Sequence, residues 1–467
     1  MNATRGHSCR LLCLIAVAME AAYAVIHLGR TNEERILWML VAYAVCGASW
    51  GWLVWRGGRA YSFGPKAVGN AGHCSDQNIP VAERINTNSR GMLVLVFIAG
   101  LVFRATLFPL TPSASQDVRR YLWEGLVQQA SFSPYEHAPN AEALQPLARQ
   151  HADLHQRINH HDLAAIYPPV AQLLFRANAA LFGGSLFGWK LILLAFDLFL
   201  VATVLMMLRG RGVAVLGLIG VWWCPLLLFE TYEGGHLDLI GAALLAFAVF
   251  AMLRGRPAVA AVALGLAVNV KYIWPALAGV LLLGALTSWR RRAVFALIAG
   301  LTAAICWMPY VRELPSAVAT ARIFAEHWTF NDPIFEYMRR LPGPRWLPLS
   351  LILAGLTGMA LYLNRKSRGR DLWQDVWLLN GTALLTGPVA YPWYFLWIVP
   401  GLAFRPPAWL LLWIFCVPAL HVVDWHYVRT GAWDAMPWLW WMVDAAPLVL
   451  LLWAWRTRTG NLPMATR

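Results

Sequence analysis

Long apolar runs are the feature of this sequence that most constrains its fold. They recur between residues 11 and 455 of the 467-residue chain, and a membrane-spanning helix needs about 20 mainly apolar residues. Hydrophobic residues make up 59% of the chain and charged residues 13%, whereas a soluble protein is about 45–50% apolar and about 25% charged. Mean hydropathy is +0.51. These values exclude a soluble enzyme and a disordered chain, and they predict a polytopic membrane protein.

The runs predict an all-α transmembrane bundle of about 12–14 spans, since several runs are short. They lie near residues 11–29, 36–55, 91–110, 186–208, 213–229, 237–253, 258–274, 276–288, 293–310, 347–363, 374–389, 391–404, 408–423 and 437–455. Residues 56–90 are polar and glycine-rich, as in a linker. We therefore expect two N-terminal helices with a cytoplasmic linker (1–90), followed by a larger transmembrane domain (91–467).

The apolar stretch 167–183 is interrupted by Arg176 and Asn178. Counted as a span, it would invert every later loop and break the charge pattern described next. We interpret it as an interfacial or re-entrant helix that starts at Pro168 and Pro169, because proline suits the first turn of a helix.

Basic residues mark every second loop between the runs. Fourteen arginines and lysines lie in these loops against one acid, Asp371, and the positive-inside rule puts such loops in the cytoplasm. Both chain ends then lie inside. The loops near 111–165, 230–236, 311–346, 390–392 and 424–436 face outward and hold most of the His, Asp, Tyr and Pro residues. The net charge of +14 therefore reflects membrane topology and lipid contacts, and it is no sign of nucleic-acid binding.

The first outward loop holds Asp117 at the start of an expected amphipathic helix. Its carboxylate has two interpretations: a cap for the helix N-terminus, or an acid/base group at the membrane surface. Arg120 and Glu124 are four residues apart and can pair. The run from His160 to Asp162 matches no named metal site. We expect no resident cofactor or metal, with a divalent ion not excluded.

Four further polar and aromatic clusters lie on the same predicted face. They are ETYEGGHLD with Glu230, His236 and Asp238, VNVKYIWP with Lys271, AEHWTFNDPIF with His327, Trp328 and Asn331, and AYPWYFLW with Tyr391 and Trp393. A lysine within an apolar helix is costly unless it is paired or reaches the interface, so Lys271 is a functional candidate. Arg104 and Asp197 lie inside spans, and we expect each to be half of a buried ion pair.

Seven segments in order resemble a known family: SxDVxRYLWEG, SPYEHAP, HHDxxxIYPP, EGGHLD, VKYIWP, EHWTFNDPIF and AYPWYFLW. Over residues 91–425 the chain is similar to the bacterial polyprenol-phosphate-mannose-dependent mannosyltransferases of the GT-C glycosyltransferase type. One departure is Gln116, which stands where an acidic residue often precedes the aspartate. A single carboxylate argues against a metal site built from paired acids.

The resemblance implies a plasma-membrane enzyme whose active site faces the periplasm or outside. It would transfer a hexose, expected to be mannose, from a polyprenyl-phosphate donor to a lipid or glycan acceptor with inversion. Asp117 maps to the catalytic base of such enzymes. The candidates for binding the donor phosphate are Arg120, Lys271, His236 and His327. The candidates for binding the sugar or the acceptor are Tyr121, Tyr167, Glu230, Asp238, Trp328, Asn331, Tyr391 and Trp393.

Two other functions fit the class of protein. A secondary transporter or lipid-linked sugar flippase would place its polar site near the bilayer midplane, often within internal repeats. Here the polar residues lie at the outer ends of the runs, which disfavours transport. An O-antigen ligase or polymerase shares the lipid-phosphate leaving group, and only the order of the motifs separates it.

Overall fold

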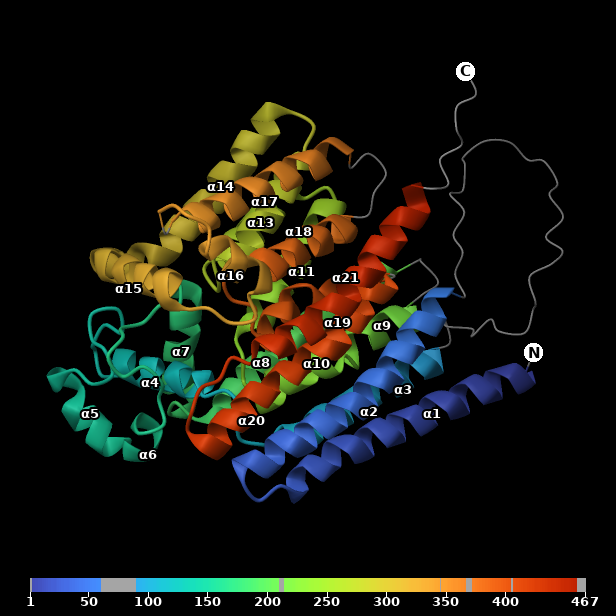
Figure 1. The fold of residues 1–467 in the computed structure, drawn as a ribbon, viewed down its shortest axis with the longest axis horizontal. Coiled ribbons are helices and arrows are strands. Elements are labelled where there is room, and N and C mark those ends of the chain that lie inside the picture. The colour runs from blue at the N-terminus through green and yellow to red at the C-terminus, as the bar shows by residue number, and fades with distance from the viewer. Residues whose placement is uncertain are drawn as a thin grey trace.

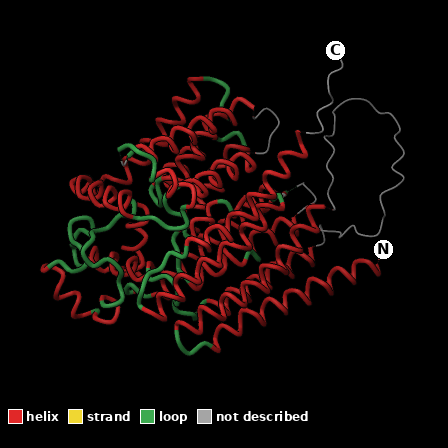
Figure 2. Tube along the Cα trace, viewed as in Figure 1, coloured by secondary structure: helices red, strands yellow, loops and turns green. Residues whose placement is uncertain are grey.

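The computed structural model is a helical bundle (Figures 1 and 2), with 78% of the residues in helices. It describes residues 2–59, 90–209, 214–344, 346–366, 372–404 and 406–459. Within these ranges there is no strand, and a single parallel bridge pairs Phe330 with Val389. The all-α prediction is therefore confirmed. The linker predicted at 56–90 lies mostly outside the described residues.

Seven segments of the described chain are long and apolar enough to cross a membrane, which confirms a multi-pass membrane protein. They are Cys9–Leu28, Asn32–Arg56, Arg90–Leu107, Leu186–Leu208, Trp289–His327, Leu347–Arg365 and Ala408–Thr430. The helices that build them are α1 (Asn2–Ala24), α2 (Asn32–Arg59), α3 (Arg90–Leu107), α8 (Leu186–Leu208), α14 (Trp289–Trp307), α15 (Leu314–His327), α17 (Leu347–Lys366), α19 (Ala408–Cys416) and α20 (His421–Thr430).

The remaining helices are shorter or lie outside these seven segments. They are α4 (Asp117–Gln129), α5 (Gln145–Gln150), α6 (Ala152–His155), α7 (Pro169–Phe182), α9 (Ala214–Trp222), α10 (Pro225–Leu228), α11 (Asp238–Leu253), α12 (Pro257–Val268), α13 (Ile273–Gly284), α16 (Pro333–Arg339), α18 (Leu372–Thr386) and α21 (Pro437–Thr459). Among these, α11, α12 and α13 are apolar helices below spanning length. The total of 12–14 spans stays a prediction.

The helices of the outer loops gather at one end of the bundle. Helices α4, α5, α6 and α15 lie at the left of Figure 1, whereas α1 starts at the opposite end. Two of the five loops predicted to share one face of the membrane, 111–165 and 311–346, therefore have helices at the same end of the molecule. Which compartment this end faces stays a prediction.

Residues 167–183 form α7, a helix of 14 residues that has Pro169 in its first turn and is not among the seven candidate spans. The predicted start of this helix is confirmed. It ends at Gly183, whose φ of +63° is the left-handed conformation that closes many helices. Helix α7 packs against α4 and α8, and it so connects the first outer loop to the bundle.

Two predicted spans are interrupted where proline breaks the helical hydrogen bonding. The segment 391–404 is not one helix, as predicted, but two 3-10 helices, η6 (Pro392–Trp397) and η7 (Val399–Ala403). The run 213–229 is split into α9 and α10 before Pro225, and a π-helical turn, η4 (Phe229–Glu233), follows it. Such π turns are frequent at functional sites, and η4 carries Glu230 and Glu233.

The prediction that Arg104 and Asp197 are each half of a buried ion pair is confirmed, and the structure shows that each is the other's partner. Arg104 Nε lies 2.7 Å from Asp197 Oδ2, and both side chains are at most 2% exposed. The Tyr232 hydroxyl donates to the same oxygen over 2.8 Å. This pair joins α3 to α8 inside the bundle.

Candidate active site

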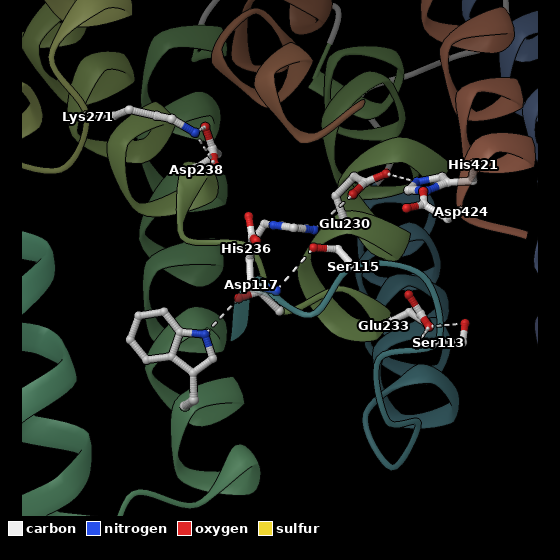
Figure 3. A network of polar contacts seen from close by, with 12 residues as sticks. Ser113, Ser115, Asp117, Glu230, Glu233, His236, Asp238, Lys271, His421 and Asp424 are labelled. Atoms are coloured by element: carbon white, nitrogen blue, oxygen red, sulfur yellow. Dashed lines mark hydrogen bonds and ion pairs between the residues drawn. The ribbon is translucent and has the colours of Figure 1, made fainter. Parts of the chain in front are cut away.

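The chain segment before Asp117 is held in place by polar contacts from two other parts of the bundle. Lys190 of α8 donates to the Leu110 carbonyl over 2.5 Å. The backbone N–H and the hydroxyl of Ser113 both donate to Glu233 Oε1 of η4, each over 2.6 Å. The Asp117 N–H then donates to the Ser115 hydroxyl over 3.2 Å (Figure 3). These contacts fix the point at which α4 begins.

Asp117 is the first residue of α4, and its side chain is half-buried. One carboxylate oxygen, Oδ1, accepts a hydrogen bond from Asn159 Nδ2 over 3.1 Å. Burial raises the pKa of Asp117, while the Asn159 hydrogen bond and the charge of Lys271 act in the opposite direction. Among the described hydrogen bonds, this carboxylate receives none from a backbone N–H of α4, so the geometry favours the acid/base interpretation over the helix cap. No motif in the sequence singled out Asn159.

Arg120 pairs with Glu124 over 2.8 Å, which confirms the predicted contact between residues four apart. The other two nitrogens of its guanidinium group donate to backbone carbonyls: Nη1 to that of His160, over 2.9 Å, and Nη2 to that of Leu163. Arg120 thus fastens the loop around residue 160 to α4 and brings Asn159 to Asp117. Its predicted contact with the donor phosphate stays a prediction.

Lys271 is held by an acceptor and an aromatic ring. Its ammonium group lies 2.8 and 3.0 Å from the two carboxylate oxygens of Asp238 and 3.7 Å above the centre of the Tyr394 ring. The indole of Trp397 donates to Asp238 Oδ1 over 2.7 Å. Asp238 is fully buried, while the Lys271 side chain is 19% exposed. Asp238 therefore orients the cation, and its predicted contact with the sugar or the acceptor stays a prediction.

A chain of acids and histidines runs beside this pair (Figure 3). His421 lies between Glu230 Oε1, at 2.9 Å, and Asp424 Oδ2, at 2.8 Å. Because carboxylates only accept hydrogen bonds, both ring nitrogens of His421 must carry protons when both acids are ionised. The second oxygen of Glu230 lies 3.6 Å from Nε2 of the fully buried His236. Sequence reasoning missed His421, which lies near the end of the apolar run 408–423, and Asp424, which follows that run directly.

Four aromatic rings form a continuous stack that joins three of the predicted clusters. The His236 ring lies 3.9 Å from Trp393, Trp393 lies 4.5 Å from Tyr391, and Tyr391 lies 4.6 Å from Phe330, between ring centroids. Backbone hydrogen bonds between Phe330 and the segment 388–390 reinforce the stack. Because neighbouring rings cover the faces of Trp393 and Tyr391, a sugar could meet only their edges in this conformation.

Other predicted site residues lie farther from this network. His327 is exposed, and its described contact is with the Ile323 carbonyl of its own helix. Trp328 packs against Phe324 and against the edge of His160, so it connects the second long outer loop to the first. Asn331 is buried next to Phe330 in a left-handed conformation, with φ of +50°.

Tyr121 and Tyr167 contact each other edge to face, with ring centroids 5.0 Å apart. Their rings also pack against Phe175 of α7, which makes them part of the support of α4. Among the described residues, no three side chains of His, Cys, Asp and Glu come together as a candidate metal site.

Residues 81–290 match a family model described as alpha-(1->6)-mannopyranosyltransferase, N-terminal domain. The matched residues include Asp117, Glu230, Asp238 and Lys271. Neither the curated proteins nor the solved structures gave a match to this chain. The family match agrees with the resemblance to GT-C mannosyltransferases seen in the motifs. Residues 81–290 of this membrane protein are thus similar to the N-terminal domain of a mannosyltransferase family.

Proposed function

We propose that this protein is a mannosyltransferase that takes its mannose from a polyprenyl-phosphate donor and passes it, at the outer face of the membrane, to a lipid or glycan acceptor. The family match supports the transferase over a transporter or flippase. Helix α4, which begins with Asp117, lies with the other outer-loop helices at one end of the bundle, and this position supports a reaction at the membrane surface.

The observation that carries the proposal is the environment of Asp117. Its carboxylate is half-buried, anchored through one oxygen by Asn159, and close enough to Lys271 for the lysine charge to lower its pKa. A carboxylate in such a position can take the proton of an acceptor hydroxyl as that hydroxyl attacks the sugar. Asp117 is therefore the general base of the proposed reaction.

The proposed reaction is a single displacement. The acceptor oxygen forms a bond to C1 of mannose, its proton moves to Asp117, and the bond between C1 and the donor phosphate oxygen breaks. The electron pair of that bond leaves with the lipid phosphate. One displacement inverts the configuration at C1, in contrast to the two displacements of retaining enzymes.

Lys271 is the cation best placed to stabilise the departing phosphate. An ammonium group has three donors, and its described hydrogen bonds use two of them on Asp238. Its side chain is partly exposed, and its charge acts on the nearby Asp117 carboxylate. A fixed positive charge aimed at a developing phosphate anion stabilises the transition state without reorganisation.

The donor and the stereochemistry are tested together with purified protein in lipid nanodiscs. The protein is incubated with mannose, glucose and galactose on polyprenyl phosphate, and with a nucleotide-linked mannose as a control. We expect consumption of the polyprenyl-phosphate mannose and a product whose anomeric configuration is opposite to that of the donor. Use of the nucleotide sugar alone, or retention at C1, would contradict the proposal.

The outer location of the site is tested by cysteine labelling. Ala130 is exposed at the end of α4, so Ala130→Cys in a background without the native cysteines gives one reactive position. A membrane-impermeant maleimide should label it from the outside of intact cells. Labelling only after the cells are opened would place the site on the cytoplasmic face.

A further inference from the structure

The N-terminal helix pair, α1 and α2, lies outside the residues that match the mannosyltransferase family model. We call it, with its connecting turn, the N-terminal hairpin (Asn2–Arg59). It packs along α3 and α9 and against α20 in Figure 1. The hairpin therefore lies against α3, the helix that leads into the loop carrying Asp117.

The turn of the hairpin reaches this loop through one arginine. Arg35 Nη1 donates to the Thr111 hydroxyl over 2.8 Å, and Arg35 Nε donates to the Gly29 carbonyl over 3.2 Å. Thr31 and Glu34 form reciprocal hydrogen bonds between side chain and backbone at the start of α2, an arrangement that fixes a helix N-terminus. Arg35 thus extends from a well-defined turn to a residue six positions before Asp117.

The path from α3 to Asp117 is consequently held from three sides. Lys190 binds the Leu110 carbonyl and Glu233 binds Ser113, and both of these residues lie in the region that matches the family model. Arg35 holds Thr111, which lies between these two anchors. Thr111 is exposed, whereas the next four residues are buried, so the hairpin secures the part of the path that the rest of the bundle covers least.

The hairpin also contacts η4, the π turn that carries Glu230 and Glu233. The Phe229 ring lies 5.5 Å from the Tyr23 ring and 5.6 Å from the Tyr43 ring, between centroids. Phe229 opens the π turn η4, which presents Glu230 and Glu233. The Tyr43 hydroxyl donates to the Ile414 carbonyl over 2.7 Å, which fixes one of these rings.

We propose that the N-terminal hairpin is a positioning module of the active site and that Arg35 is its positioning residue for the segment 111–116. This inference rests on the proposed function only in taking Asp117 as the base. A base must lie within hydrogen-bond reach of the hydroxyl it deprotonates, and a misplacement of about 1 Å can cost as much as 100-fold in rate. Loosening Thr111 should therefore lower turnover without removing any group that touches the substrates.

The test uses full-length Arg35→Met, Arg35→Lys, Thr111→Val and the double variant Arg35→Met/Thr111→Val. Arg30→Met is the matched control, because it makes the same change in the same turn and Arg30 has no described contact with Thr111. Amide hydrogen exchange over residues 111–117 is measured in nanodiscs without substrate. Melting midpoint, kcat and KM for polyprenyl-phosphate mannose are measured on the same preparations.

We expect faster exchange over 111–117 in Arg35→Met and Thr111→Val, and a kcat lowered about five- to tenfold at unchanged KM and melting midpoint. The double variant should be no slower than either single one, because both remove the same interaction. Arg35→Lys should recover part of the rate, and Arg30→Met should resemble the native protein.

Unchanged exchange over 111–117 in Arg35→Met would overturn the inference, and so would an equal loss of rate in Arg30→Met. A fall in kcat that follows a fall in melting midpoint, without recovery in Arg35→Lys, would mean that the hairpin only stabilises the fold. The exchange measurement needs no catalysis, so it still reports on the hairpin if Asp117 proves not to be the base.

Discussion

The bundle contains two cation–carboxylate pairs of nearly equal length in very different surroundings. Arg104 and Asp197 lie 2.7 Å apart, and Lys271 and Asp238 lie 2.8 Å apart. The carboxylate is fully buried in both pairs, and in both it also accepts a hydrogen bond from an aromatic residue, Tyr232 or Trp397. The pairs differ in the cation, which is 2% exposed in Arg104 and 19% exposed in Lys271.

In the Arg104–Asp197 pair, which we call the closed pair, the cation is engaged with groups of the protein itself. Arg104 also donates to the carbonyls of Gly100 and Trp222 and lies against the Trp222 ring. Lys271 is held only from the side of Asp238 and Tyr394 in the described contacts, and its charge acts against the rise that burial causes in the pKa of Asp117. We therefore propose a structural role for the first pair and a catalytic role for the second, although an intramembrane charge is a functional candidate in both cases.

Arg104→Met should have the largest effect, because it leaves Asp197 buried without a cation. Removing one partner of a buried pair costs about 3–5 kcal/mol, enough to prevent a marginal protein from folding. We expect little folded protein in detergent, as judged by size-exclusion chromatography and melting. Normal yield and melting would show that the closed pair does not stabilise the bundle.

The two pairs separate most clearly when each is neutralised as a unit. Lys271→Met/Asp238→Asn should stay folded but lose about 100-fold or more in kcat, since the positive charge that stabilises the departing phosphate is gone. Arg104→Met/Asp197→Asn should keep its turnover per folded molecule, even at a lower melting midpoint. If the two double variants lose turnover equally, the distinction between the pairs fails.

The pH dependence of the rate should report the state of Asp117. A general base works only when ionised, so kcat/KM should fall as the pH is lowered through the pKa of Asp117, which burial raises. Asn159→Ala removes a hydrogen bond that favours the ionised form. The acid limb of the profile should therefore move to higher pH in this variant. An unmoved limb would mean that another group controls it.

His327→Ala should have the smallest effect. The side chain is exposed, and its described contact is within its own helix, so we expect kcat and KM to change by less than about twofold. A loss comparable to that of the Lys271 double variant would show that the second long outer loop closes over the donor phosphate during the reaction.

The sequence predicted the features that depend on local composition. The helical class, the start of α7 near Pro168 and Pro169, and the burial of Arg104 with Asp197 follow from apolar periodicity, proline chemistry and the cost of a lone charge in lipid. The Arg120–Glu124 pair follows from helical spacing.

Contacts between distant segments could not be predicted in the same way. His421 meets Glu230 across 191 positions, and Trp397 meets Asp238 across 159. Each lies in an apolar run that looks like ordinary membrane helix. The break of 391–404 into two 3-10 helices was missed because hydrophobicity alone does not reveal where Pro392 and Pro400 divide a span.

The measurement that tests the central claim most directly compares Asp117→Asn with Asp162→Asn. Both changes remove one carboxylate from the first outer loop, and Asp162 is exposed. With polyprenyl-phosphate mannose as donor, we expect Asp117→Asn to melt like the native protein and bind the donor but to lose transfer by at least about 100-fold. Asp162→Asn should transfer at the native rate. Full transfer by Asp117→Asn would contradict the assignment of Asp117 as the base.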